Sequence, residues 1–147
     1  MSLNKITAIL MIEVIGKPPE HLREMLNKII ENIGNEKGVV VKEKKVNEST
    51  LMKDSKEFYI NFAEVEVEIE EMVSLLGLML KYMPAHIEII KPEKISLTNN
   101  DWNILLNEVA LRLHQYDEVA RVLQTEKKIL VGKLKEVLNK NANTKAS

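Results

Sequence analysis

Cysteine is absent from this 147-residue sequence, long apolar runs are absent, and neither sign of charge is in clear excess. The absence of cysteine excludes disulfide frameworks, thiolate metal sites and cysteine nucleophiles. Lys+Arg (21) and Asp+Glu (22) nearly balance, and a net charge of −1 argues against a general nucleic-acid-binding protein. No apolar run is long enough to cross a membrane and the N-terminus lacks a signal-peptide layout, so we expect a cytoplasmic protein.

The hydrophobic content of 45% is high enough to form a core, and the length suits one domain with an appendage. The first hundred residues predict an α+β order, β-α-β-β-α-β, that is typical of a ferredoxin-like sandwich with a four-stranded antiparallel sheet and two helices on one face. The predicted strands are Lys5–Ile15, Val39–Val46, Glu57–Glu68 and His86–Ile90, and the helices have apolar faces at Leu22–Ile33 and Ile69–Met83. The polar stretch Asn47–Ser55 is predicted to be an exposed loop.

The individual faces follow from the spacing of apolar residues. Ala8, Leu10, Ile12 and Val14 alternate along the first strand. The first helix repeats apolar residues at helical spacing: Leu22, Met25, Leu26, Ile29, Ile30 and Ile33. The second helix is apolar on two faces and therefore needs two covers, the sheet and something else. One face holds Ile69, Met72, Val73, Leu76, Met79, Leu80 and Met83, and the other holds Leu75, Leu78 and Tyr82.

Residues 98–147 predict a second domain, a long helix that runs to about Asn139 and ends in a frayed polar tail. Thr98 and Asp101 have capping-box spacing at its start. Apolar residues then recur every 3.5 residues on average, which is the coiled-coil repeat. We define the seam as the eleven residues of this repeat, which form the predicted oligomer interface: Trp102, Leu106, Val109, Leu113, Tyr116, Ala120, Leu123, Lys127, Leu130, Leu134 and Val137.

Lys127 is the single charged residue of the seam, and it would lower stability while restricting register or strand number. Leu105, Ala110, Leu111 and Val119 widen the apolar surface in the first half of the helix. We therefore expect the first half to pack on the preceding domain, and the second half to project and pair.

Two groups of polar residues are candidates for chemistry. His114, Asp117 and Glu118 share a helical face and could hold a metal ion, although an exposed charged face explains them more simply. On the sheet, Glu13, Glu64 or Glu66, and Glu88 could gather on the face away from the helices, where crowded carboxylates could raise a pKa or hold a divalent cation. The alternative is a solvated sheet face with Lys42 and Lys44 as ionic partners, and we favour it. We therefore predict no metal site and no cofactor.

The third predicted strand carries Phe58, Tyr59 and Phe62, where RNA-recognition motifs carry stacking aromatics. Residues 57–71 contain six Glu and no Lys or Arg, so a phosphate chain would be repelled, and core packing of the phenylalanines is the better interpretation. Residues 121–147 carry seven Lys+Arg and two Glu, a sum of +5 that could meet an acidic partner or nucleic acid. The solvated outside of a coiled coil is the simpler explanation.

The segments MIEVIGKPPEHL (11–22), NFAEVEVEIE (61–70), YMPAHIEII (82–90) and LRLHQYDEVA (111–120) resemble a family of uncharacterised archaeal proteins. The resemblance spans residues 5–138. It implies a ferredoxin-like domain followed by a C-terminal helix, and it implies no catalytic residues.

The leading hypothesis is therefore a homo-oligomeric interaction or scaffold module, a dimer by preference, that assembles through the seam or binds a partner helix with it. An apolar seam of this length would make an exposed monomer prone to aggregation. A second hypothesis is a ligand-sensing module like the ACT domains, which share this element order, with the Gly16–Pro19 turn as the site. Nucleic-acid binding through residues 121–147 is a third hypothesis. An enzyme is the least favoured, and we predict no catalytic residues.

Overall fold

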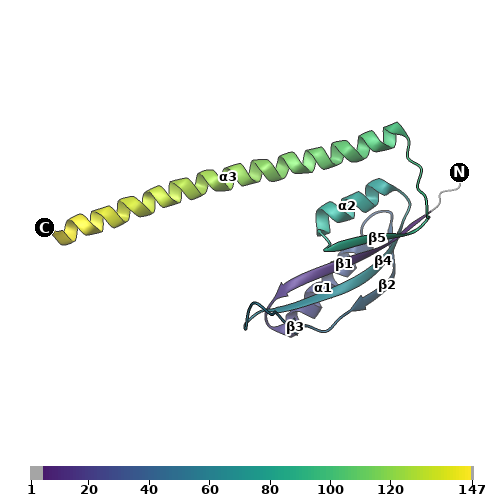
Figure 1. The fold of residues 1–147 in the computed structure, drawn as a ribbon, viewed down its shortest axis with the longest axis horizontal. Coiled ribbons are helices and arrows are strands. Elements are labelled where there is room, and N and C mark those ends of the chain that lie inside the picture. The colour runs from purple at the N-terminus through teal and green to yellow at the C-terminus, as the bar shows by residue number, and fades with distance from the viewer. Residues whose placement is uncertain (1–4, 147) are drawn as a thin grey trace. The chain divides into compact units, whose positions relative to one another are not determined.

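The computed structural model describes residues 5–146 and has an α+β architecture (Figure 1). An antiparallel sheet carries two helices and is followed in the chain by a long third helix. The elements are β1 (Ile6–Gly16), α1 (Pro19–Gly34), β2 (Val39–Val46), β3 (Thr50–Leu51), β4 (Tyr59–Ile69), α2 (Met72–Tyr82), β5 (His86–Lys91) and α3 (Asn99–Ala146). No helix among the described residues is long and apolar enough to span a membrane.

The sheet has the order β2-β4-β1-β5, with every neighbouring pair antiparallel. This order confirms the predicted ferredoxin-like class, because the first and third strands of the βαββαβ pattern lie at the centre. The short strand β3 is an addition to the predicted four strands. Thr50 lies opposite Ile60, and Leu51 lies opposite Tyr59, inside the segment predicted to be a loop. Its side chains are exposed, so the apolar pattern on which the prediction rested carried no sign of the strand.

One face of the sheet and one face of each helix form a single core. The alternation in β1 is confirmed, since Ala8 and Leu10 are fully buried. Leu22, Leu26, Ile30 and Ile33 supply the buried face of α1, and Ala63, Val65, Val67 and Ile69 supply that of β4. Both helices contribute to this one cluster, so both pack on the same sheet face. Met25 is an exception to the predicted helical face, because its side chain is exposed.

Two details of the second helix differ from the prediction. Ile69 was placed in that helix, but it is the last residue of β4 and is 1% exposed, because it continues the inward alternation of Val65 and Val67. Leu75 and Leu78 are the buried residues of α2, whereas Met79 and Met83 are exposed. The face that packs on the sheet is therefore the smaller of the two apolar faces seen in the sequence.

The chain divides into two compact units, residues 1–105 and 106–147, and each is described by itself. The sequence had predicted a division between residues 97 and 98. Helix α3 continues to Ala146, beyond the predicted end near Asn139. No proline or glycine follows Gly132 to stop the helix, and Thr144 Oγ1 donates a hydrogen bond back to the Lys140 carbonyl at 2.8 Å.

Candidate oligomerisation interface on helix α3

Helix α3 begins with the predicted capping box. The Asp101 backbone N–H donates to Thr98 Oγ1 at 3.1 Å, and the Thr98 N–H donates to Asp101 Oδ2 at 3.0 Å. The hydrogen bonds from the Thr98 backbone and side chain lower the pKa of the Asp101 carboxyl. These reciprocal bonds satisfy backbone N–H groups at the start of the helix and stabilise its first turn.

Most apolar side chains of the seam are exposed. Leu130 has 66% of its surface exposed, and Leu106 and Leu113 each have 61%. Trp102, Tyr116, Leu123, Leu134 and Val137 are exposed as well, as are Ala120 and Lys127, and Val109 is half-buried. Helix α3 is continuous across all eleven seam residues, so their 3.5-residue spacing forms one line along its surface.

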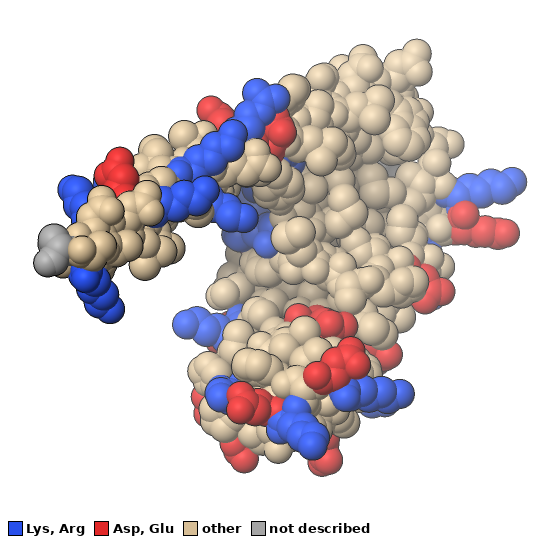
Figure 2. Space-filling model, turned by 60° about the vertical axis from the view of Figure 1, so that its left-hand side comes forward, with Lys and Arg blue, Asp and Glu red and all other residues tan. Residues whose placement is uncertain are grey.

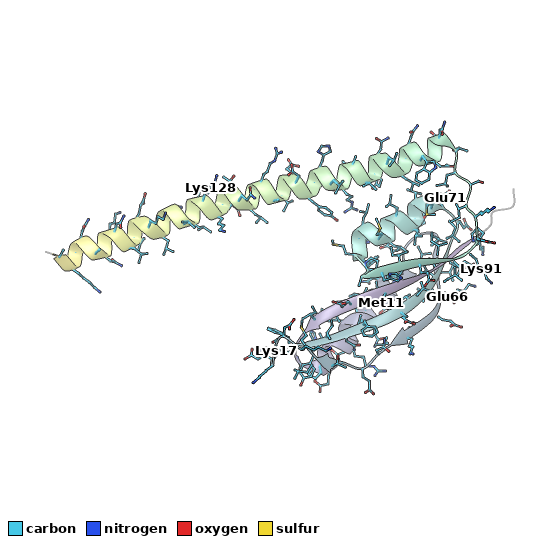
Figure 3. The ribbon with its side chains drawn as sticks, in the orientation of Figure 1. Met11, Lys17, Glu66, Glu71, Lys91 and Lys128 are labelled. Atoms are coloured by element: carbon cyan, nitrogen blue, oxygen red, sulfur yellow. The ribbon has the colours of Figure 1, made fainter. Side chains whose placement is uncertain are left out.

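Helix α3 carries many charged residues in addition to the apolar residues of the seam. Asp117 and Arg121 form an ion pair at 3.0 Å, one helical turn apart. Figure 2 shows more blue than red side chains on the helical arm at the left of the view, which matches the +5 sum of residues 121–147. Lys128 projects from the middle of α3 in Figure 3. In the described residues, no group of three His, Asp or Glu side chains is placed to hold a metal ion, the His114 group included.

Seven exposed large aliphatic residues of α3 lie outside the seam: Ile104, Leu111, Val119, Val122, Ile129, Val131 and Leu138. Leu111 and Val119 were expected to widen the apolar surface, and the other five were not singled out. Four of the seven lie along a second line on the helix: Ile104, Leu111, Val122 and Ile129. Their spacing of 7, 11 and 7 residues is visible in the sequence. It was missed because the 3.5-residue repeat of the seam does not include it.

The sheet face away from the helices does not gather the predicted carboxylates into one group. Glu66 and Glu88 lie on opposite sides of Ile9, and Glu64 lies beside Met11 in the next row. Figure 3 shows Met11 and Glu66 on the neighbouring strands β1 and β4. Glu13 lies opposite Phe62, a further row away. Glu66 and Glu88 lie on the two strands that flank β1, about 10 Å apart, and no group of three carboxylate or histidine side chains in the described residues is placed to hold a metal ion.

Lysines on β2 neutralise part of this face. Lys42 Nζ lies 3.7 Å from Glu68, and Lys5 donates a 2.9 Å hydrogen bond to the same carboxylate. The hydrogen bond from Lys5 lowers the pKa of Glu68. A bulge between Val41 and Glu43 shifts the register, so Lys45 lies opposite Glu64 and Lys44 lies opposite the inward residue Val65. The predicted position of Lys44 beside these carboxylates is therefore wrong, and Lys42 pairs with Glu68, which is outside the predicted group of four.

The phenylalanines are not core residues, contrary to the prediction. Phe58 is 41% exposed and Phe62 is 39% exposed. Phe62 faces outward because Asn61 and Ala63, its neighbours in β4, face inward. Tyr59 alone of the three packs against the core. Extending the alternation of Ala63, Val65 and Val67 backward would have shown that Phe62 faces solvent.

The turn between β1 and α1 is tied to the β3–β4 region by polar contacts. Ser49 Oγ donates to the Pro19 carbonyl at 2.8 Å and accepts from Asn61 Nδ2 at 3.2 Å. Asn61 is 1% exposed, and its Oδ1 has no partner among the described residues. Lys17 lies 3.6 Å from Glu57 and 5.5 Å from the centre of the Phe58 ring. These contacts account for the local structure of the turn that the ligand-sensing hypothesis had singled out.

A family model of the MJ0538 family matches residues 7–140, which include the sheet, both short helices and most of α3. The chain belongs to the MJ0538 family. It is similar to the uncharacterized protein MJ0538 of Methanocaldococcus jannaschii, with 35% identity over 86 residues. The aligned part covers 57% of this chain and 33% of that protein, so the chain spans about a third of the relative's length. No solved structure gives a significant match.

These comparisons confirm the predicted resemblance to an uncharacterised archaeal family. The family match includes all eleven seam residues, because it extends to residue 140. The helix is therefore part of the family's shared region and not an addition specific to this chain.

Proposed function

We propose that this protein is a homo-oligomeric interaction module, a dimer in its simplest form, in which the seam of α3 joins two copies. The α+β unit would serve as the body that the paired helices hold together. The proposal concerns the assembly and assigns no catalytic step, cofactor or metal.

The exposure of the seam is the observation that supports this proposal. Three leucines of the second half, Leu123, Leu130 and Leu134, each have more than half of their surface exposed. Fully burying one such side chain is worth about 1.5–3 kcal/mol, so a partner helix would gain several times that amount along the seam. A monomer that left this line in water would be prone to aggregation.

Lys127 restricts how two seams can meet. A parallel pair in register would place Lys127 beside the same residue of the second copy, which is unfavourable. An antiparallel pair centred between Arg121 and Val122 would place it opposite Tyr116, whose ring can accept a cation. The same antiparallel register would set the small Ala120 against the large Leu123, so the two seams would fill each other's space.

The test is the absolute solution mass of the full chain, measured by light scattering during size exclusion. We expect at least twice 16.9 kDa for the native protein. The variant Leu123→Asp plus Leu130→Asp should fall toward the monomer mass while the sheet unit stays folded. The matched control is Asn103→Asp plus Asn139→Asp, which adds the same charge at exposed polar positions of α3 and should leave the mass unchanged.

A native protein of 16.9 kDa, or a seam variant with the native mass, would refute the proposal. Amide hydrogen exchange of β1 and β4, which pair at the centre of the sheet, reports whether the sheet unit is intact in each variant. The ligand-sensing and nucleic-acid hypotheses stay predictions, and no specific contact in the described residues favours either over the seam.

A further inference from the structure

Helix α3 carries a second apolar line, which we call the back stripe: Ile104, Leu111, Val122 and Ile129. Each side chain is between 49% and 52% exposed. Successive members are 7, 11 and 7 residues apart. Because each residue advances about 100° around the helix axis, each side chain points only about 20° away from the one before it. All four therefore lie within a narrow sector of one straight helix.

The back stripe is distinct from the seam. Leu111 and the seam residue Leu113 are two positions apart and so project about 160° from each other. Val122 and Ile129 are each one position from a seam leucine, which places them about 100° away. A helix paired through its seam would thus leave the back stripe facing solvent, and a helix that is apolar on two faces requires two covers.

Glutamates border the back stripe on both sides. Glu108 and Glu126 lie about 50° to one side, and Glu118 and Glu136 lie about 30° to the other. Lys133 lies about 30° to the same side as Glu108 and Glu126, so four carboxylates and one ammonium group border the stripe between residues 104 and 136. Glu126 comes 18 residues after Glu108, and Glu136 comes 18 residues after Glu118. The same interval separates Val122 from Ile104 and Ile129 from Leu111. Eighteen residues make five full turns, so an aliphatic pair with its two glutamates occurs twice along one face.

These four carboxylates have no ionic partner within the described residues, in which the single ion pair on α3 joins Asp117 to Arg121. An apolar line about 38 Å long, bordered by free carboxylates, complements a helix that has aliphatic residues flanked by lysine or arginine. The back stripe of a second copy would instead add four more glutamates to the same contact. Charge thus selects a basic partner over self-pairing.

We propose that the back stripe binds a basic amphipathic helix of a partner protein, side by side along Ile104–Ile129. The aliphatic residues would supply the contact area, and the four glutamates would select lysine- or arginine-flanked partners over acidic ones. This inference does not depend on the proposed function, because the seam and the back stripe use different residues.

The test uses the full chain and a fluorescent helical peptide that has leucine at its a and d positions and lysine at e and g. A second peptide with glutamate at e and g is the control. We expect the lysine peptide to bind at least tenfold more tightly, measured by fluorescence anisotropy, and its affinity to fall as salt is added. The charge-reversal variant Glu108→Lys, Glu118→Lys, Glu126→Lys, Glu136→Lys should weaken lysine-peptide binding at least tenfold and reverse the preference.

The variant Leu111→Gln plus Val122→Gln, which retains helix-forming residues, should weaken the lysine peptide by a similar factor. The seam variant Leu123→Asp plus Leu130→Asp should still bind it. Equal binding of both peptides, or full binding by either back-stripe variant, would overturn the inference. So would a fall in solution mass in Leu111→Gln plus Val122→Gln, because it would show that a second copy covers the stripe.

Discussion

Tyr82, the last residue of α2, donates a 2.6 Å hydrogen bond to the Glu36 carboxylate in the turn between α1 and β2. Lys81 donates a second hydrogen bond to the same carboxylate oxygen. The bonds from Lys81 and Tyr82 lower the pKa of Glu36. Burial, together with the bond to Glu36, raises the pKa of Tyr82 to about 12. One carboxylate thus connects the ends of the two helices that cover the sheet.

This connection predicts a loss of stability in alkali. The folded chain favours the neutral Tyr82 hydroxyl, so its contribution is complete below the ordinary tyrosine pKa of about 10 and is lost as pH rises toward about 12. We expect the unfolding free energy of the native chain to fall more steeply across this window than that of Tyr82→Phe. Urea unfolding at several pH values measures it, and parallel curves for the two proteins would contradict the prediction.

Tyr82→Phe should also lower stability at neutral pH by about 1 kcal/mol, the typical net value of one hydrogen bond. The same linkage acts in acid through Glu36. Its lowered pKa means that its contribution is present above the ordinary carboxyl range and is lost as pH falls through and below that range. Tyr59→Phe, a change at another tyrosine that packs against the core, controls for the loss of a hydroxyl as such.

Ser49 is predicted to stabilise the turn between β1 and α1. Ser49→Ala removes both the donor to the Pro19 carbonyl and the acceptor for the buried Asn61 amide. Leaving a buried amide without a partner costs about 1–3 kcal/mol, so urea unfolding should show a loss of that size. Ser96 is exposed, so Ser96→Ala should change the unfolding free energy by at most about 0.5 kcal/mol. An equal effect of the two substitutions would refute the argument.

Gly132 is predicted to weaken α3. The helix is continuous through this residue, and an added Cβ would meet no atom within 4 Å. Gly132→Ala should therefore stabilise the helix by about 1 kcal/mol, the ordinary propensity difference. Thermal unfolding followed by far-ultraviolet circular dichroism is the measurement. A lower melting temperature would mean that the open surface at Gly132 is occupied by a partner in solution.

Lys127 is predicted to lower the stability of the assembly and to restrict the register or the number of helices in it. Lys127→Leu should raise the melting temperature of the assembly, because an apolar residue replaces a charge in the seam, and it should broaden the distribution of masses. Lys128→Leu, at the neighbouring exposed position outside the seam, is the matched control. If both substitutions have the same effect on mass and melting, Lys127 has no special place in the interface.

Much of the fold could be read from apolar spacing. The alternation in β1 and β4 and the helical spacing in α1 predicted which residues face the core, because a side chain's face follows from its position in a regular element. The capping box of α3 was predictable for a similar reason, since Thr98 and Asp101 need only local backbone geometry to bond each other. The seam was recognisable in the sequence as a 3.5-residue repeat. The back stripe lies in the same segment of sequence, but it does not follow that repeat and was overlooked.

Other features depend on contacts between distant segments. Strand β3 forms because the backbone of Thr50 and Leu51 pairs with β4. The side chains of β3 are exposed, so no buried apolar pattern marks the strand in the sequence. The bulge near Lys42 decided which lysine of β2 faces Glu64, because one extra residue moves every later side chain to the opposite face.

The sequence by itself determined the order of the elements, the βαββαβ class and the long helix with its 3.5-residue seam, since each depends on periodicity within one segment. The tertiary structure alone decided that Glu66 and Glu88 are separated by Ile9, that Lys45 lies opposite Glu64, and that Glu36 joins Lys81 and Tyr82. These outcomes depend on strand register and on the packing of residues far apart in the chain, which local spacing does not encode.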